Sequence, residues 1–156
     1  MNGNKRVIDF LNTPLLANEL AAVIQYGHHE AVAINAGLKA HAEYIARRKA
    51  GEQEHVIELR DHILLLGGGP ITDPGEINAV EDTEGGLNSD DASEQTAIDD
   101  YTNGIALAVG FKDEATANLL RHILDEEVAH KNGTETVKKQ IEGAGYANWA
   151  ASQFGG

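Results

Sequence analysis

Apolar residues recur at every third or fourth position along two long stretches of the chain, a spacing that predicts amphipathic helices. The first stretch runs from about Thr13 to Gly67, with a corner at Ala36–Gly37–Leu38. Its second helix carries Glu43 to Leu66 and ends at Gly67–Gly68–Gly69–Pro70, because a run of glycines followed by proline terminates a helix. This stretch predicts an antiparallel pair of helices.

A polar segment separates the two stretches. From Gly67 to about Ser89 the chain is rich in Gly, Pro, Asp and Asn. A helix that begins near Asp82 would include Gly85–Gly86, which costs about 1 kcal/mol for each glycine. A second pair of helices follows, from Asp90 to Gly110 and from Glu114 to Ile141. Structureless connections of this length are uncommon inside compact domains, but some helix bundles contain one long crossover.

Both ends of the helical region have a distinctive feature. Pro14 suits a first helical turn capped by Thr13, or a bend in a helix that begins earlier. At the other end Gly143–Ala144–Gly145 closes the last long helix, and Tyr146 to Phe154 form a short terminal helix that needs docking to be stable. We therefore expect one all-α domain over residues 1–156, a four-helix bundle of two antiparallel hairpins with a long crossover and a short C-terminal helix.

Acidic, histidine and tyrosine residues repeat between the two hairpins at an offset of 75 residues. In each half, 33 positions separate a lone Glu from the Glu of a Glu-x-x-His pair. The repeated pairs are Glu19 and Glu94, Glu52 and Glu127, His55 and His130, and Tyr26 and Tyr101.

The acidic and histidine members of this repeat all lie on apolar helix stripes, so four helices each direct a carboxylate towards the core and two add an imidazole. Four buried and unpaired carboxylates would be very costly, whereas two divalent cations balance their charge. Residues at i and i+3 lie on neighbouring turns, so each Glu-x-x-His pair can bind one metal while the lone Glu residues bridge or complete the coordination. Di-iron helix bundles contain this ligand set, and its oxygen and nitrogen donors suit Fe, Mn or Zn. The alternative is a set of salt-bridged or partly exposed helix residues, with Arg48 and Arg60 as the nearest cations.

Composition removes several other classes of function. The chain has no Cys, which excludes disulfides, thiolate metal sites and thiol catalysis. Its 25 Asp+Glu against 12 Lys+Arg give a net charge of −13, which repels nucleic acid and anionic lipid and attracts cations. We find no run of 18 apolar residues and no apolar core of a signal peptide, so we expect no membrane span and a cytoplasmic location.

At these residues the sequence resembles bacterioferritin, within the ferritin-like superfamily. The resemblance covers nearly the whole chain and is carried by NELAAVIQY, GLKAHAEY, EQEHVIELRDHILLLGGGP, LDEEVAHKNGTETVKKQIE and the tail GAGYANWAASQ. It implies a ferroxidase that binds two Fe per subunit, oxidises Fe(II) with O2 or H2O2 and deposits Fe(III) inside a 24-subunit cage built from dimers.

The resemblance also implies a role for each site residue. Glu52 and His55 would serve one iron, Glu127 and His130 the other, and Glu19 and Glu94 would complete the two sites. Tyr26 corresponds to a tyrosine near the site that hydrogen-bonds a ligand or supplies an electron. For Tyr26 and Tyr101 the alternative is ordinary core packing with a satisfied hydroxyl.

The sequence departs from the bacterioferritin pattern at four positions. Gln53 stands where the family has its haem-ligating Met, so we expect no haem ligation by that route. The family often has an Asp before each Glu-x-x-His, orienting a His; here those places hold Gly51 and Glu126. Arg47 replaces an auxiliary His of the inner surface, so iron transfer to the cavity would differ, or storage would not be the main role.

Two other hypotheses and three other histidines stay open. The chain could be a non-storage Fe or Mn redox protein of the same fold, consuming peroxide in a smaller oligomer, or a structural bundle that binds no metal. His62 lies seven residues after His55, and a structural role is favoured over metal binding. His28 and His29 are expected at the surface or the inner wall.

Overall fold

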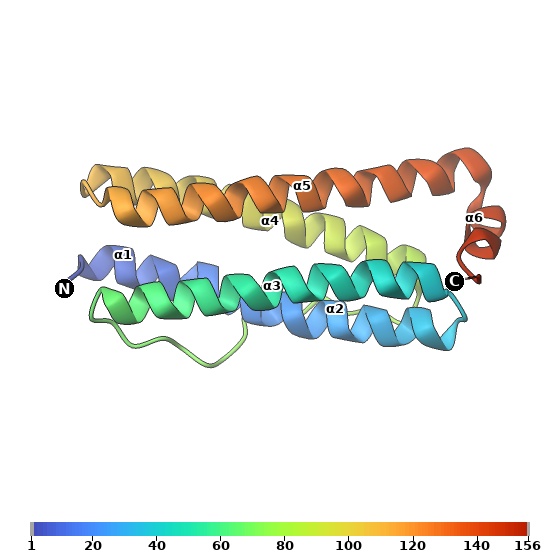
Figure 1. Cartoon of the computed structure of the whole chain (residues 1–156), viewed down its shortest axis with the longest axis horizontal. Coiled ribbons are helices and arrows are strands. Elements are labelled where there is room, and N and C mark those ends of the chain that lie inside the picture. The colour runs from blue at the N-terminus through green and yellow to red at the C-terminus, as the bar shows by residue number, and fades with distance from the viewer. Residues whose placement is uncertain (1, 156) are drawn as a thin grey trace.

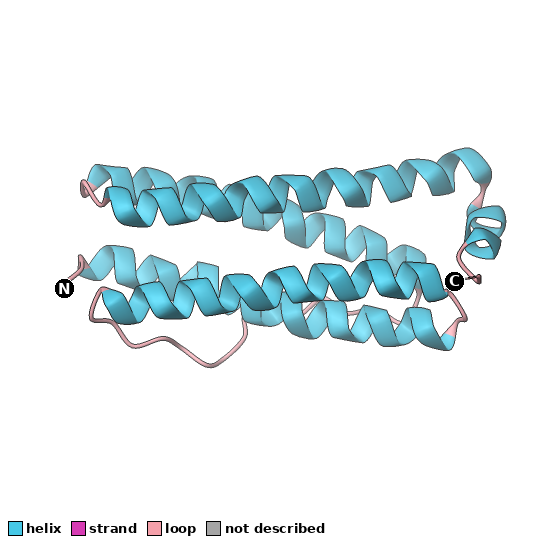
Figure 2. Ribbon diagram, in the orientation of Figure 1, coloured by secondary structure: helices cyan, strands magenta, loops and turns pink. Residues whose placement is uncertain are grey.

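The computed structural model describes residues 2–155, and within that range the chain consists of helices and connecting loops (Figure 2). Helices α2 and α3 form one antiparallel hairpin and α4 and α5 form the other, and the two hairpins lie side by side (Figure 1). The predicted all-α four-helix bundle with a short C-terminal helix is confirmed. The helices are α1 (Lys5–Phe10), α2 (Ala17–Asn35), α3 (Lys39–Leu65), α4 (Thr83–Gly110), α5 (Glu114–Ala144) and α6 (Tyr146–Ser152).

The first long helix begins before Thr13 and bends there, the second of the two predicted alternatives. Asn4 caps its start by accepting a 2.9 Å hydrogen bond from the Arg6 backbone N–H. A wide turn over Leu11–Leu16 joins α1 to α2, with Thr13 extended (φ −139°, ψ 112°) and a cis Thr13–Pro14 peptide bond. A residue that precedes proline is disfavoured in the helical region, so the helix bends at this point.

Helix α4 begins at Thr83, earlier than the predicted span from Asp90 and close to the alternative start near Asp82. The Asp82 carboxylate accepts a 2.6 Å hydrogen bond from the Gly85 backbone N–H and so caps the helix. Gly86 then faces the His29 ring, where an added Cβ would lie 3.3 Å from Cγ. The glycine pair that weakens the helix in isolation therefore permits close packing of α4 on α2.

The crossover runs along the length of the bundle, so that α3 and α4 point in the same direction (Figure 1). Side chains of α2 hold it in place: Gln25 accepts from the Asn78 backbone N–H at 3.0 Å, and His29 Nε2 accepts from the Val80 N–H at 3.1 Å. Both side chains also bond Asp90 of α4, at 2.8 and 2.9 Å. His29 is therefore buried at the centre of this network, and its expected place at the surface or inner wall was wrong.

The apolar core is divided into two clusters along the bundle axis. One cluster is centred on Leu59, Ile63 and Leu120 at the end near α1. The other contains Ile45 and is closed by Trp149 of α6, which docks the terminal helix over the end of the bundle (Figure 1). The polar residues of the predicted metal site lie between these two clusters.

One helical segment, Lys5–Asn35, is long and apolar enough to cross a membrane on length and composition alone. Its apolar residues supply much of the bundle core, and it also buries the polar side chains of Glu19, Gln25 and His29. This pattern is typical of a core helix in a bundle, which passes the same test.

Candidate metal centre

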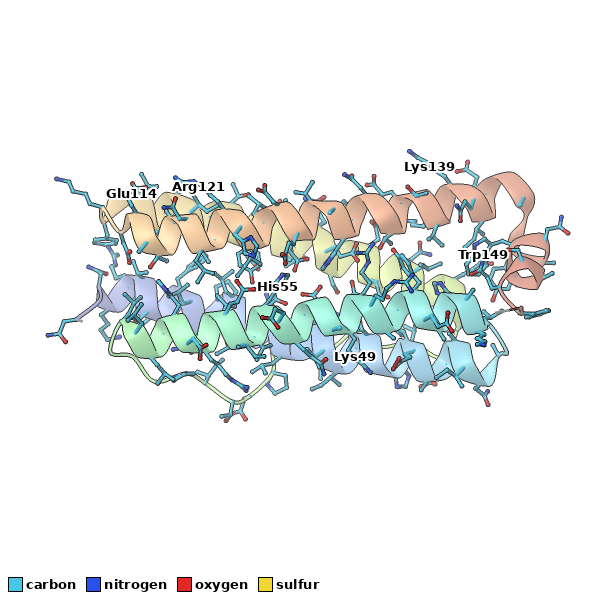
Figure 3. The ribbon with its side chains drawn as sticks, viewed as in Figure 1. Lys49, His55, Glu114, Arg121, Lys139 and Trp149 are labelled. Carbon is cyan, nitrogen blue, oxygen red and sulfur yellow. The ribbon has the colours of Figure 1, made fainter. Side chains whose placement is uncertain are left out.

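Four carboxylates meet in the middle of the bundle, one from each long helix. They belong to Glu19 on α2, Glu52 on α3, Glu94 on α4 and Glu127 on α5, and none of these residues is more than 3% exposed. The labelled His55 marks this place in Figure 3, where it points from α3 towards the opposite hairpin. The structure thus brings donor atoms of Glu19, Glu52 and Glu127 within 4.8 Å of one another and of His55. Glu94 lines the same pocket but lies outside this close group.

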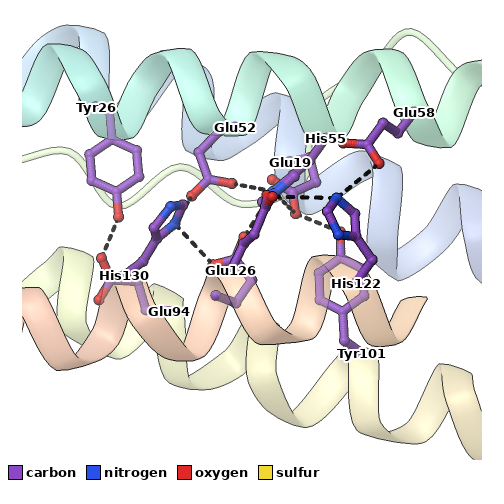
Figure 4. A network of polar contacts seen from close by, with 11 residues as sticks. Glu19, Tyr26, Glu52, His55, Glu58, Glu94, Tyr101, His122, Glu126 and His130 are labelled. Carbon is purple, nitrogen blue, oxygen red and sulfur yellow. Dashed lines mark hydrogen bonds and ion pairs between the residues drawn. The ribbon is translucent and has the colours of Figure 1, made fainter. Parts of the chain in front are cut away.

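The His55 ring sits at the centre of this group (Figure 4). Its Nδ1 lies 3.1 Å from a Glu52 oxygen, 3.1 Å from a Glu127 oxygen and 3.4 Å from a Glu19 oxygen. Its Nε2 lies 2.6 Å from Oε2 of Glu126. When Nε2–H donates to this carboxylate, the neutral ring keeps its Nδ1 lone pair for a metal, the usual role of a carboxylate behind a ligating histidine.

The second imidazole, His130, lies across the same pair of carboxylates. Its Nδ1 is 3.3 Å from Oε1 of Glu52 and 3.7 Å from Oε2 of Glu127. Each of these two glutamates therefore directs one oxygen towards His55 and the other towards His130. The shared position falls to the glutamates of the Glu-x-x-His pairs, whereas sequence reasoning allowed the lone glutamates to bridge.

The two repeat tyrosines hold the lone glutamates crosswise. Tyr26 of the first hairpin donates a 2.6 Å hydrogen bond to Glu94 of the second. Tyr101 of the second hairpin donates a 2.5 Å hydrogen bond to Glu19 of the first. Thr134 adds a 3.0 Å bond to Glu94. Sequence reasoning placed Tyr101 in the repeat but left its role open, and it missed Thr134.

Several buried polar atoms of this cluster have no hydrogen-bond partner among the described residues. They are Oε2 of Glu94, Oε1 of Glu127 and Nδ1 of His130. The last two do approach other site atoms, at 3.1 and 3.3 Å, but without the angles of a hydrogen bond. Buried polar groups are normally satisfied, and converging oxygen and imidazole lone pairs are the donor set that Fe, Mn or Zn accepts. The residues present therefore fit a pair of divalent cations.

Three of the four carboxyl groups resist ionisation in the absence of a cation. Burial raises the pKa of Glu52 to about 7, with a further contribution from the neighbouring Glu127 charge. Burial likewise raises the pKa of Glu94 to about 7, against the lowering effect of the Tyr26 hydrogen bond. The pKa of Glu19 is also well above its ordinary value, first because of burial and then because of neighbouring carboxylates.

The proton is held most firmly by the central imidazole. Burial alone would lower the pKa of His55, but the close carboxylates of Glu127, Glu19 and Glu52 outweigh it and raise the pKa well above the ordinary value. Burial would raise the pKa of Glu127, but the close approach of the His130 and His55 imidazoles lowers it to about 2. Metal-free, the cluster is thus a protonated network, and a cation that binds must displace protons.

The alternative of salt-bridged helix residues does not describe this site. Across residues 2–155, no Lys or Arg side chain forms an ion pair with the four central carboxylates. The imidazoles are the charged partners of Glu19, Glu52 and Glu127, and Glu94 is held by hydroxyl groups. Arg48, one of the two candidate cations, instead donates a 3.0 Å hydrogen bond to the Tyr44 hydroxyl.

The remaining histidines lie outside the cluster. His62 contacts the Thr116 hydroxyl at 2.7 Å, a structural role as favoured from the sequence. His28 is half-buried and lies 3.2 Å from Glu81.

Comparison with known proteins agrees with this arrangement. The Ferritin-like domain family matches residues 8–144. Bacterial ferritin of Neisseria meningitidis serogroup B is 31% identical over 155 residues, covering 99% of this chain and 100% of the relative. Bacterioferritin of Streptomyces coelicolor is 32% identical over 146 residues, covering 93% of this chain and 87% of the relative.

Solved structures extend the agreement to three dimensions. The bacterioferritin BfrA of Mycobacterium tuberculosis superposes with a TM-score of 0.96 at 27% identity, covering 99% of this chain and 98% of that one. The sequence match, the fold and the buried Glu and His cluster point in one direction: this chain belongs to the ferritin-like family, and its relatives there are bacterioferritins and bacterial ferritins.

Proposed function

We propose that this protein stores iron and that its buried centre is a ferroxidase site, which binds two Fe(II) as substrate and oxidises them. The observation that supports this most directly is the set of buried, unpartnered Glu and His atoms that face one another across the two hairpins. Membership of the ferritin-like family and the names of the relatives support storage.

In this proposal the two glutamates between the imidazoles, Glu52 and Glu127, serve both irons. Glu19 and His55 complete one iron site, and Glu94 and His130 complete the other. Tyr26 and Tyr101 fix the outer carboxylates through their short hydrogen bonds. Burial raises the pKa of both phenols well above the ordinary value, so each hydroxyl keeps its proton and can donate.

The reaction balances with an external oxidant. Two Fe(II) each lose one electron, and O2 takes up both electrons with two protons to give H2O2. With H2O2 as oxidant, the same two electrons and two protons give two waters. Iron binding displaces protons from the carboxyl groups, and the two protons that the oxidant takes up come from the site or from solvent.

We further propose that Fe(III) passes into the interior of a 24-subunit cage assembled from dimers, in the cytoplasm, and that the chain of residues 1–156 folds as one domain. Gln53 is exposed on α3 and offers no sulfur ligand, so we propose that haem does not bind there. Mn or Zn would occupy the same donors as competitors of Fe(II).

The test combines particle mass with iron chemistry. A cage has a mass of roughly 400 kDa, given a 16.7 kDa subunit, and is measured by light scattering during size exclusion. Anaerobic Fe(II) titration should give about two ions per chain, and aerobic additions beyond that should remain soluble as mineral. A dimer that binds two irons but retains no mineral would favour the peroxide-consuming redox protein; a protein that binds no Fe(II) would leave a structural bundle.

A further inference from the structure

A second cluster of carboxylate and imidazole groups lies outside the buried centre, between α3 and α5. Glu58 comes from α3, and His122 and Glu126 come from consecutive turns of α5 (Figure 4). His122 Nε2 lies 3.3 Å from Oε1 of Glu126 and 3.7 Å from Oε2 of Glu58. One donor atom from each residue falls within 4.8 Å of the other two. We call this group the outer trio.

The donor atoms of the outer trio are of the kinds that bind divalent metals. One imidazole and two carboxylates are donors that Zn, Fe and Mn accept, and three protein ligands leave room for water. Within residues 2–155, no Lys or Arg side chain pairs with Glu58 or Glu126; their charged contacts are histidines.

A fully buried imidazole connects the outer trio to the centre. Glu126 directs Oε1 towards His122 and Oε2 towards Nε2 of His55, at 2.6 Å. His55 is 0% exposed, and its other nitrogen faces the central carboxylates. A single carboxylate thus joins a solvent-accessible donor group to a ligand of the buried centre, and the side chain of His122 is 56% exposed at the outer end.

We propose that Glu58, His122 and Glu126 bind a third divalent cation on the α3–α5 face. Binding at this site does not depend on the ferroxidase reaction. Its use as a station through which iron passes between the centre and that face does rest on the proposed function. Glu126 also bonds His55, so it can give only one oxygen to a cation at the outer trio. A site with few protein ligands and open water positions should therefore release its cation readily rather than hold it permanently.

The test uses Zn(II), because it binds such donors without oxidation. In calorimetric titration the wild-type protein should bind three Zn(II) per chain, and the variant Glu58→Gln/His122→Asn should bind two. The matched control, His28→Asn/Glu81→Gln, removes another surface His–Glu contact of 3.2 Å and should leave three. Anomalous diffraction at the Zn edge on wild-type crystals should show a peak among the three side chains, independently of whether a variant folds.

Failure of this inference is distinct from failure of the proposed function. Two Zn(II) per chain in both wild type and variant, with anomalous peaks only at the buried centre, would overturn the outer site and leave the ferroxidase proposal intact. A peak at the outer trio with none at the centre would do the reverse. For the transfer role, the variant should oxidise the first two Fe(II) per chain at the wild-type rate and slow later turnovers several-fold; unchanged later turnovers would refute that role.

Discussion

The two halves of the proposed metal centre have matching donor residues but different surroundings. Behind His55, the carboxylate of Glu126 accepts from Nε2 at 2.6 Å and continues outward to His122. Behind His130 the corresponding position is Gly51, where even an added Cβ would lie 3.2 Å from ring atom Cε1. One histidine is therefore oriented by an acid, and the other has no carboxylate behind it.

The His130 half has a cationic side chain nearby instead, that of Arg48. The Arg48 guanidinium lies over the Tyr44 ring at 4.8 Å and donates to its hydroxyl. It fits because Gly133 has no side chain, since an added Cβ would collide with the guanidinium. The Arg48 charge also opposes the effect of burial on the pKa of Glu94.

This difference shows which residues a di-metal centre would constrain, the donors, and which it would not, the residues behind the donors. The candidate donors repeat in both hairpins, as two ions that each need oxygen and nitrogen ligands would require. The residues behind the donors are under no such constraint, and here they make one half acidic and the other basic. We therefore expect the His55 half to hold its metal more tightly, because a hydrogen-bonded carboxylate raises the basicity of a ligating histidine.

The largest effect is expected from removing a shared ligand. Glu127→Ala should lower the rate of Fe(II) oxidation by on the order of 100-fold or more, since loss of a residue behind a ligand already costs about 10–100-fold. Glu94→Ala should also slow oxidation severely but retain about one Fe(II) per chain, because it serves one half only. Stopped-flow oxidation and anaerobic titration measure these quantities, with exposed Glu54→Ala as the control. Wild-type rates in either ligand variant would contradict the assignment.

The residues behind the two histidines, Glu126 and Gly51, can be substituted to make the two halves more alike. Glu126→Ala should weaken metal binding in the His55 half by roughly 10–100-fold. Gly51→Asp should strengthen binding in the His130 half, provided the ring shifts by a few tenths of an ångström to admit the side chain. Competition with a chromogenic chelator reports both affinities. If Glu126→Ala left both affinities unchanged, the difference between the halves would have no energetic consequence.

Acidity should affect both halves alike. Because Glu52 and Glu94 have pKa values of about 7 in the metal-free protein, cation affinity should fall by on the order of tenfold between pH 7.5 and pH 6, as protons compete. Calorimetry in buffers of different ionisation enthalpy should show proton release on Zn(II) binding. At pH 9 Glu52 and Glu94 are already ionised, so proton release on Zn(II) binding should be smaller than at pH 6. An equal proton release at pH 9 would contradict the assignment of the released protons to these two carboxyl groups.

Glu52 and Glu94 also determine how the stability of the metal-free protein changes with pH. Their folded pKa values exceed the ordinary carboxyl value of 4.5, so the folded state holds protons that the unfolded chain has lost, and the free energy of unfolding falls as pH rises through 7. His41 has the opposite sign, since burial lowers its pKa to about 4, but it acts only below 6.5. Urea unfolding at pH 6.5 and pH 8 should show this loss, and Glu52→Gln/Glu94→Gln should reduce it.

The smallest effect concerns the cation in the His130 half. Gly133→Ala should destabilise the protein by about 1–3 kcal/mol, because the added methyl displaces Arg48 from a filled space. Without that collision, Gly→Ala inside a helix stabilises by roughly 1 kcal/mol. In an Arg48→Ala background the same change should therefore stabilise, and a double-mutant cycle from urea unfolding measures the reversal. Additive effects would mean that Arg48 does not occupy this space.

Sequence reasoning succeeded where the signal was local or repeated. The period of apolar residues gave the long helices, and the offset between Glu19 and Glu94 gave the ligand candidates. It gave the main span of α4 too late a start, at Asp90, and left the correct start near Asp82 as an alternative. The two glycines that look unfavourable in isolation are stabilised by the Asp82 cap and by packing on His29. Sequence reasoning also misplaced His29, whose burial depends on a distant carboxylate, Asp90.

The sequence by itself determined which face of each helix carries the acids and imidazoles, because helical periodicity fixes that face locally. Only the tertiary structure decided that Glu52 and Glu127 lie between the imidazoles, that each tyrosine reaches the opposite hairpin, and that Glu58 meets His122 on the α3–α5 face. These contacts depend on the axial register and rotation of one hairpin against the other. That register is set by packing across the whole core, which no local pattern along the chain records.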